Sequence, residues 1–261
     1  AVADETAQIM EYSNQLEAKS GELTTTARKL RDANDKLTKL SIQKDAFLSQ
    51  ISHELRTPMT SIRAFSEILQ DPDLSDGDRP KYARIIEDET QRLTRLLDDL
   101  LDLSVLENGQ VSLELRQARL RDILDRAEAS ANVEQHIRIR RSAGREDISI
   151  LTDPDRLTQV FINLMSNAAK YCEAQRPELI VSVSETPAAI TVDFIDNGAG
   201  VDKANQDMIF EKFARASDHS KAGGAGLGLA ICREIVSNLG GQISYLPGQR
   251  GAAFRVSLPR D

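Results

Sequence analysis

A seven-residue apolar repeat runs through residues 1–41 and constrains the fold of this chain more than any other feature. Its members are Ile9, Leu16, Leu23, Leu30 and Leu37. On a helix this spacing places apolar side chains on one stripe, which is typical of a coiled coil. The second core position of the heptad holds fewer apolar residues. That position belongs either to the seven-residue series that starts at Ser13 or to the one that starts at Tyr12. We therefore predict a coiled coil over residues 1–41, which serves either as a dimerisation stalk or as a signal-transmitting helix.

Apolar residues at helical spacings continue from residue 42 to residue 107, interrupted by the sequence DPDLSDGD. Asp, Pro and Gly in this break form turns, and Pro80 suits the first turn of a following helix. The pattern predicts a helical hairpin, to which we assign residues 42–110. Because two helices alone bury too small a core, we expect a second copy of the chain to complete a dimeric four-helix bundle.

Short alternating runs begin after residue 118 and predict β-strands. The runs are DISILTD, LIVSVSE, AITVDFID and AFRVSLP, and they are interleaved with helical stretches at 118–131, 154–171 and 226–239. Strands and helices in mixed order indicate an α/β sandwich. The ENGQ turn at residues 107–110 marks the predicted boundary, so residues 111–261 form a separate domain.

The composition excludes several classes of protein. With a formal net charge of −8 and no long basic run, the chain has little with which to bind nucleic acid. No segment has the roughly 18 to 20 continuous apolar residues that cross a bilayer. Cys172 and Cys232 lack CxxC spacing, so we expect reduced thiols, with a disulfide as the alternative. Because the chain starts at Ala1 directly in helical sequence, we expect a cytoplasmic fragment whose sensor or membrane part lies upstream.

The segment FLSQISHELRTPMTSI, residues 47–62, places a histidine on the first helix of the hairpin. His53 lies about 200° around the helix from the apolar Ile51, so we expect it to face solvent. Glu54 adjoins it, and Pro58 removes the backbone donor to the Glu54 carbonyl, which predicts a local bend. An exposed imidazole beside a carboxylate is suited to act as a nucleophile with its base. An ordinary surface histidine is the alternative.

The helical segment DRLTQVFINLMSNAAKY, residues 155–171, carries two amides on one face. Asn163 and Asn167 are four residues apart, and Lys170 and Tyr171 follow within a turn. Amide oxygens can ligate Mg²⁺ or hold its waters when the ion bridges phosphates. An amide pair with a purely structural role inside the helix packing is the alternative.

Two glycine-containing segments follow, DFIDNGAG at 193–200 and GGAGLGLAICREIV at 223–236. Asp196 at a strand tip puts a carboxylate beside backbone that a flat ring can approach, because Gly198 and Gly200 carry no side chain. For this segment an ordinary turn is the alternative. In the second segment a glycine-rich loop runs into a helix, where free backbone N–H groups favour phosphate. This loop lacks the preceding strand of the dinucleotide-binding fingerprint.

In this order and spacing, the four segments resemble those of the sensor histidine kinases of two-component systems, over residues 42–261. FLSQISHELRTPMTSI is similar to the H box, NLMSNAAKY to the N box, DNGAG to the G1 box, IFEKF to the F box and GGAGLGLAI to the G2 box. The resemblance implies a HisKA-type dimerisation and phosphoacceptor domain, followed by a gyrase- and chaperone-like ATP-binding domain. It also implies a homodimer, and a parent protein anchored in the inner membrane.

The resemblance implies a catalytic role for each residue that matches the H box. His53 would attack the γ-phosphate of ATP, with Glu54 as the base or as the group that orients the imidazole. The phosphoryl group would then pass to an aspartate in the receiver domain of a response regulator. Thr57 would orient the water that dephosphorylates this partner, so both kinase and phosphatase directions are expected.

The other boxes imply the contacts to ATP and Mg²⁺. Asp196 would hydrogen-bond the adenine amino group, while Asn167 would ligate Mg²⁺ with support from Asn163. Lys170 and Arg215 would contact phosphates, and Tyr171 would pack against the nucleotide. The lid over the phosphates would be formed by Gly224, Gly226, Leu227 and Gly228. Ala225 departs from the hydroxyl residue common in the family, whereas His136, expected at a strand edge on the surface, and His219 match no box.

Two other functions remain alternatives to the kinase. One is a dimeric scaffold that binds nucleotide without transferring phosphate. Loss of the functional residues from the boxes would favour it, but in this chain the histidine, the amides, the carboxylate and the glycines of the boxes are all present. A chaperone- or gyrase-like ATPase would release phosphate without labelling the protein, and it would need neither the hairpin nor His53.

Overall fold

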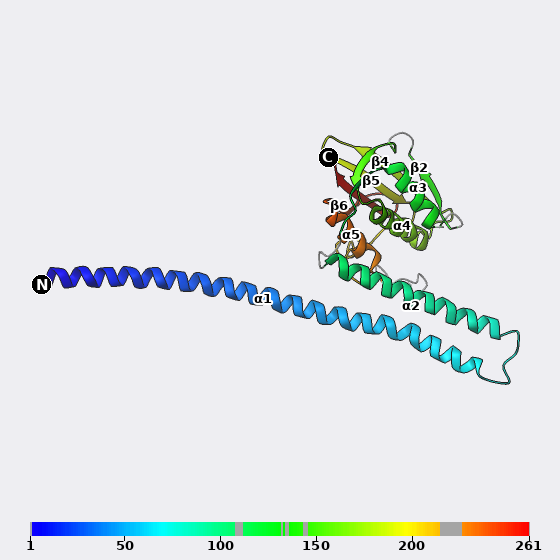
Figure 1. Cartoon of the computed structure of the whole chain (residues 1–261), viewed down its shortest axis with the longest axis horizontal. Coiled ribbons are helices and arrows are strands. Elements are labelled where there is room, and N and C mark those ends of the chain that lie inside the picture. The colour runs from blue at the N-terminus through cyan, green and yellow to red at the C-terminus, as the bar shows by residue number, and fades with distance from the viewer. Residues whose placement is uncertain are drawn as a thin grey trace. The chain divides into compact units, whose positions relative to one another are not determined.

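The computed structural model describes residues 2–107, 112–131, 133, 136–142, 146–214 and 226–260 (Figure 1). The chain divides into two compact units, Ala1–Arg56 and Thr57–Asp261. The first unit is helical over its described length, and the second combines a helical hairpin with an α/β domain. Among the described residues, none of the helices combines the length and the hydropathy that a membrane crossing requires.

Helix α1 (Val2–Leu69) supplies all of the first unit. It continues through Pro58 without interruption, so the proline does not end the helix. The heptad leucines Leu23, Leu30 and Leu37 are 71%, 71% and 65% exposed. The side chains of Ile9 and Leu16 lie outside the described part. A row of exposed leucines at one heptad position is the surface that a coiled-coil partner would cover.

The hairpin of the second unit consists of residues 57–69 of α1 and helix α2 (Arg79–Glu107). The Arg79 guanidinium closes the connection between them, because it donates to three carbonyl oxygens of residues 69–74 at 3.1 to 3.4 Å. Across the hairpin, the rings of Phe65 and Tyr82 stack with their centroids 5.5 Å apart. The predicted helical hairpin is therefore confirmed.

The α/β domain is built on a five-stranded sheet in the order β2-β4-β5-β7-β6. Strands β2 and β4 pair in parallel, and all other neighbours are antiparallel. A separate pair, β1 with β3, is antiparallel. The strands are β1 (Arg116–Arg119), β2 (Arg138–Arg141), β3 (Ser149–Thr152), β4 (Glu178–Glu185), β5 (Ala189–Asp196), β6 (Gln242–Tyr245) and β7 (Ala253–Pro259).

Three helices form the second layer of this domain: α3 (Leu120–Ala131), α4 (Pro154–Tyr171) and α5 (Gly228–Asn238). Helix α4 lies between α3 and α5 and packs on β5, where Phe161 and Phe194 place their ring centroids 5.2 Å apart. Alternate residues of β5 are buried along its whole length, as expected for a strand with one face against helices. The predicted α/β sandwich is confirmed.

Several local expectations differ from the structure. Strands β1, β2 and β6 were not predicted. The sequences of β1 and β2 carry no clear apolar alternation, and β6, QISY, alternates over only four residues. His136 lies exposed in a turn that precedes β2, and not in a strand. The predicted boundary at residues 110 and 111 lies outside the described residues.

Strand β2 forms one edge of the sheet and is unusually basic, with the sequence RIRR. Arg141 pairs with Asp125 and Glu128 of α3 and with Glu146. Arg140 pairs with Glu178 of the neighbouring strand at 3.3 Å. Two of the three arginines of this edge strand thus attach it to α3 and β4.

Helix α4 begins at a buried N-cap, Asp153, which is 6% exposed. Its Oδ1 accepts hydrogen bonds from the backbone N–H groups of Asp155 and Arg156, both at 3.1 Å. Its Oδ2 accepts a third bond, from the N–H of Glu114 at 3.1 Å. Pro154 occupies the first helical position, where its fixed φ is compatible with the helix. One carboxylate therefore fixes both the start of α4 and the segment before β1.

Replacing Asp153 by Ala is expected to lower the free energy of unfolding by about 1–2 kcal/mol, because the N-cap is lost. The N–H of Glu114 would also lose its acceptor. Urea unfolding followed by circular dichroism measures the change. Glu173→Ala, at an exposed position beyond the end of α4, is the matched control and should stay within about 0.5 kcal/mol of the unmodified chain. Equal losses in the two variants would contradict the capping role.

Candidate functional site

Helix α4 presents a polar face formed by Asn163, Asn167 and Lys170. These residues are at positions i, i+4 and i+7, while the opposite face carries the buried apolar side chains of the helix. Asn163 Nδ2 donates to the carbonyl oxygen of Gly228 at 3.5 Å, so this face meets the start of α5. Lys170 and Tyr171 at the end of the helix are exposed. The two amides share a face, as predicted, and it opens toward solvent at its lysine end.

Asp196 lies at the end of β5, at the predicted strand tip, and is only 8% exposed. Its Oδ1 accepts hydrogen bonds from the backbone N–H groups of Gly198 and Ala252, each at 2.9 Å. Burial raises the pKa of this carboxyl above its ordinary value, and the two backbone hydrogen bonds oppose the rise. Because Oδ1 is held by the backbone, Oδ2 is the oxygen that a donor on a ligand would meet.

Gly251 is a residue of this site that the sequence motifs did not indicate. A Cβ atom at this position would lie 2.2 Å from the carbonyl oxygen of Asp196 and 2.5 Å from its Oδ1. No real side chain tolerates such distances, so only glycine lets the start of β7 approach the carboxylate. The one signal in the sequence was a glycine two residues before the final strand.

The turn after Asp196 is held by two polar side chains that the sequence did not single out. Asn197 Oδ1 accepts from the N–H of Glu178 at 2.9 Å and from the thiol of Cys172 at 3.1 Å. The hydroxyl of Tyr245 accepts from the N–H of Val201 at 3.2 Å. Both cysteines of the chain are free and buried, so the expected reduced thiols are found. The turn is therefore tied to the end of α4 on one side and to β6 on the other.

The glycine-rich segment is described only from Gly226 onward. Gly226 has a φ of +71°, and a Cβ there would lie 2.8 Å from the backbone carbon of Phe213. The N–H of Phe213 donates to the carbonyl of Gly226 at 2.9 Å. Leu227 is the N-cap of α5, and its side chain makes no capping hydrogen bond. Arg215, His219, Gly224 and Ala225 lie outside the described residues.

The C-terminal half of α2 packs against α5 and α4 within the second unit. Asp102 Oδ2 accepts from Gln159 Nε2 at 2.8 Å, and its Oδ1 accepts from Arg156 Nη1 at 3.4 Å. Three leucines of α2 are also buried: Leu96, Leu103 and Leu106. The hydrogen bonds of Asp102 therefore join the hairpin to the helix that carries the amides.

The residues predicted to carry the phosphoacceptor chemistry lie on α1. His53 is exposed, as expected from its helical position, whereas Glu54 is 9% exposed. Gln50 Nε2 donates to Glu54 Oε1 at 3.3 Å. Thr57 is exposed and lies one helical turn after His53. His53 and Glu54 belong to the first unit, while the described residues that we predict to bind nucleotide all belong to the second.

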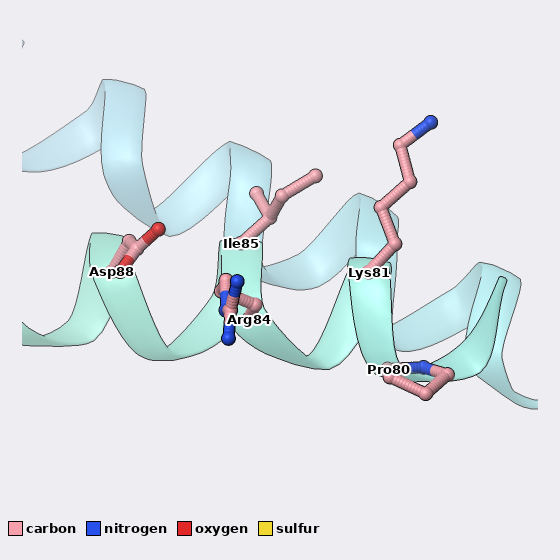
Figure 2. A pocket seen from close by; sticks show the side chains of 5 residues that line it. All are labelled: Pro80, Lys81, Arg84, Ile85 and Asp88. Atoms are coloured by element: carbon pink, nitrogen blue, oxygen red, sulfur yellow. The ribbon is translucent and has the colours of Figure 1, made fainter.

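A hollow of about 410 Å³ lies on the hairpin and is lined by Pro80, Lys81, Arg84, Ile85 and Asp88 (Figure 2). All five residues come from one stretch of α2, and α1 runs behind it. None of them belongs to the predicted nucleotide site. Figure 2 shows Lys81 and Ile85 pointing upward from the helix and Pro80 below it, so the side chains do not converge on a point.

The donor set of the α/β domain fits a nucleotide with its cation. It combines a buried carboxylate, two amides, a lysine and a helix start whose N-cap side chain makes no capping bond. Within the described ranges, no group of three or more His, Cys, Asp or Glu side chains is placed to hold a metal ion. A cation here would therefore need most of its oxygen ligands from phosphates and water, which suits Mg²⁺.

Two family models match the chain. Residues 43–109 match the His Kinase A (phospho-acceptor) domain, and residues 152–261 match the histidine kinase-, DNA gyrase B-, and HSP90-like ATPase. The sensor protein kinase WalK of Staphylococcus saprophyticus is 36% identical over 223 residues, covering 82% of this chain and 36% of that protein. A WalK of Staphylococcus aureus is 35% identical over 223 residues, which cover 82% of this chain and 53% of that protein. The chain thus spans only part of the length of these relatives.

Solved structures of histidine kinases share the fold. ThkA in complex with the response regulator protein TrrA superposes with a TM-score of 0.68 at 23% identity, over 85% of this chain and 63% of that one. For AdeS of Acinetobacter baumannii the TM-score is 0.65 at 22% identity, and the superposition covers 79% of this chain and 97% of that one. For full-length ShkA in complex with AMPPNP the TM-score is 0.58 at 26% identity, and the superposition covers 82% of this chain and 45% of that one.

The fold, the two matched domains and the relatives agree with the resemblance found in the sequence motifs. The chain belongs to the sensor histidine kinases of two-component systems.

Proposed function

We propose that this chain is an ATP-dependent protein-histidine kinase that phosphorylates its own His53. The proposal rests on the combination of two sites in one chain. An exposed histidine lies in a phospho-acceptor domain, and a buried carboxylate and an amide face lie in an ATPase-like domain. Neither part alone accounts for both features. A plain ATPase has no use for the exposed histidine, and a scaffold that only binds nucleotide has no use for a phospho-acceptor domain.

In the proposed reaction, an imidazole nitrogen of His53 forms a bond to the γ-phosphorus of ATP while the bond between that phosphorus and the β,γ-bridging oxygen breaks. ADP leaves, and Glu54 accepts or orients the imidazole proton. Phosphoryl transfer depends mainly on positioning and on charge neutralisation. For that reason the position of the nucleotide relative to His53 controls the rate.

The nucleotide would be held by residues whose geometry is described above. Asp196 Oδ2 would accept the adenine amino group, with Gly198 and Gly200 leaving room for the ring. Asn167, supported by Asn163, would hold Mg²⁺, which neutralises phosphate charge when bound. Lys170 would contact the phosphates, and Tyr171 would pack against the nucleotide. The start of α5 offers backbone N–H groups to the phosphates, beginning at Gly228.

The proposed partner is the receiver domain of a response regulator, whose aspartate takes the phosphoryl group from His53. The ThkA structure, which shares the fold, contains a response regulator. Thr57, one turn after His53, would orient water for the reverse, phosphatase reaction. The parent protein would carry a sensor or membrane part and be anchored in the inner membrane. The chain covers only 36% of the WalK of Staphylococcus saprophyticus, so that relative has further residues outside the matched part.

The proposed assembly is a homodimer through residues 1–41 as a coiled coil and residues 42–110 as a four-helix bundle. On α2, Leu97, Leu101 and Val105 lie four residues apart and are 44%, 65% and 39% exposed. On α1, the heptad leucines of the first unit are exposed to a similar degree. Pairing with a second copy would bury both stripes.

Replacing His53 by Gln is expected to remove acid-labile phosphate label transferred from γ-labelled ATP, reducing it to background, because the nucleophilic nitrogen is lost. Nucleotide binding should persist, since it depends on the other domain. His136→Gln, at an exposed histidine in a turn, is the matched control and should label normally. Persistent labelling of the His53 variant would exclude this phosphoacceptor. Phosphate release without any label would favour the ATPase.

Replacing Asp196 by Asn is expected to weaken ATP binding by at least about tenfold, which corresponds to about 1.4 kcal/mol. Asn Oδ1 can still accept the two backbone bonds, but Nδ2 then presents a donor to the donating adenine amino group. Isothermal titration calorimetry measures the affinity. Asp202→Asn, an exposed carboxylate six residues further along, should bind ATP as the unmodified chain does. Unchanged affinity in Asp196→Asn would refute adenine recognition by this residue.

The subunit that labels His53 can be found by mixing His53→Gln chains with Asn167→Asp chains. Neither variant alone should label, because one lacks the acceptor and the other replaces the proposed amide ligand by a carboxylate whose negative charge repels the phosphates. Label in the mixture would show transfer between subunits, whereas absence of label in a mixture with proven heterodimers would show transfer within one subunit.

A further inference from the structure

The thiol of Cys172 joins the end of α4 to the turn that follows Asp196. Cys172 is the residue directly after α4 and is 7% exposed, and its backbone N–H donates to the carbonyl of Ala168 at 3.0 Å. This bond fixes Cys172 to the last turn of the helix. Its Sγ donates to Asn197 Oδ1 at 3.1 Å. A side chain held by the helix therefore contacts the residue next to Asp196.

Asn197 also binds to the start of β4 and to the segment before it. Its Oδ1 accepts from the N–H of Glu178 at 2.9 Å, and its own N–H donates to the carbonyl of Glu178 at 3.2 Å. Its Nδ2 donates to the carbonyl of Arg176 at 2.9 Å. These bonds hold Asn197 from the side of the sheet, whereas the thiol of Cys172 holds it from the side of α4.

The same thiol lies beside Gly198, whose N–H donates to Asp196 Oδ1 at 2.9 Å. A Cβ atom at Gly198 would lie 3.2 Å from the Cα of Cys172, 3.5 Å from its Sγ and 3.2 Å from Asp196 Oδ1. The end of α4, the turn and the carboxylate are thus close to one another. Because Asp196 and Asn197 are adjacent in the chain, a shift of Asn197 moves the carboxylate with it.

We infer that Cys172 is a positioning residue for adenine recognition, which acts through Asn197 to hold the turn beside Asp196. The inference rests on the proposed function, in which Asp196 Oδ2 accepts the adenine amino group. That hydrogen bond depends on distance and angle, so a turn with fewer restraints forms it less well. A thiol is a weak donor, and one S–H···O bond contributes little energy. Loss of the thiol should therefore reduce selectivity for adenine and leave the fold intact.

Affinities of the full chain for ATP and for inosine triphosphate test this role. Inosine triphosphate has a ring carbonyl where ATP has the amino group, so the ratio of the two affinities measures recognition of this part of the ring. Cys172→Ala should lower the ratio about two- to fivefold, the range expected from one weak hydrogen bond. Cys172→Ser should keep the ratio of the unmodified chain, because its hydroxyl also donates. An unchanged ratio in Cys172→Ala, or equal losses in both variants, would overturn the inference.

Thr158→Val is the matched control, because it also removes one buried hydrogen bond from α4. Thr158 is 8% exposed, and its Oγ1 donates to the carbonyl of Pro154 at 2.6 Å, near the start of the helix. This variant should lower the free energy of unfolding and keep the ratio between the two nucleotides. A merely structural role of Cys172 predicts the same result for Cys172→Ala, with both affinities lowered alike. A reduced ratio in Thr158→Val would show a response to any loosening of α4 and would refute the specific role of Cys172.

A double-mutant cycle separates action through Asn197 from a direct effect of the thiol on the ring. In a chain that already carries Asn197→Ala, Cys172→Ala should change the ratio little, because the acceptor of the thiol is gone. The same fall in both backgrounds would show that the thiol acts at Gly198 or on the ring itself. That result would exclude positioning through Asn197.

These outcomes distinguish the inference from the proposed function. If the unmodified chain binds ATP and inosine triphosphate equally well, the proposed adenine contact of Asp196 fails, and the inference fails with it. If the unmodified chain prefers ATP and Cys172→Ala keeps the full preference, only the inference fails.

Discussion

The packing of α4 on β5 fixes the positions of the amide face and of Asp196 relative to each other. Phe161 of α4 meets Phe194 of β5 at 5.2 Å between ring centroids, and both side chains are fully buried. Asn167 lies six residues beyond the first aromatic ring and Asp196 lies two residues beyond the second. Asp153 fixes the start of the same helix. A shift of this aromatic contact would therefore move the amide face relative to the carboxylate, with no change in any residue that touches a ligand.

The features that the sequence predicted well are those encoded in local periodicity. The α4 bounds, Pro154–Tyr171, agree with the predicted 154–171, because an acidic N-cap and a proline mark the start and the apolar spacing persists to the end. The strand that carries Asp196 alternates over its whole length and was equally clear. The exposure of His53 followed from its angle to Ile51 around the helix.

The features that the sequence did not reveal depend on neighbours far away along the chain. Gly251 matters because it touches Asp196, 55 positions earlier, and nothing in the local sequence records that approach. The hydrogen bonds of Asp102 to Arg156 and Gln159 depend on the approach of α2 to α4, which the sequence of neither helix records. Strands β1 and β2 are short and rich in arginine, so their tendency to pair shows only in the register with β3 and β4.

The arginines of β2 have a consequence for how two copies of the α/β domain can meet. A sheet edge exposes unpaired backbone groups that invite a strand from another molecule, and charged side chains suppress this pairing. At the β2 edge, an identical strand from a second copy would bring six arginines together in one short ladder. Like charges directly opposite one another in a ladder are destabilising. Edge-to-edge pairing of two such strands is therefore disfavoured.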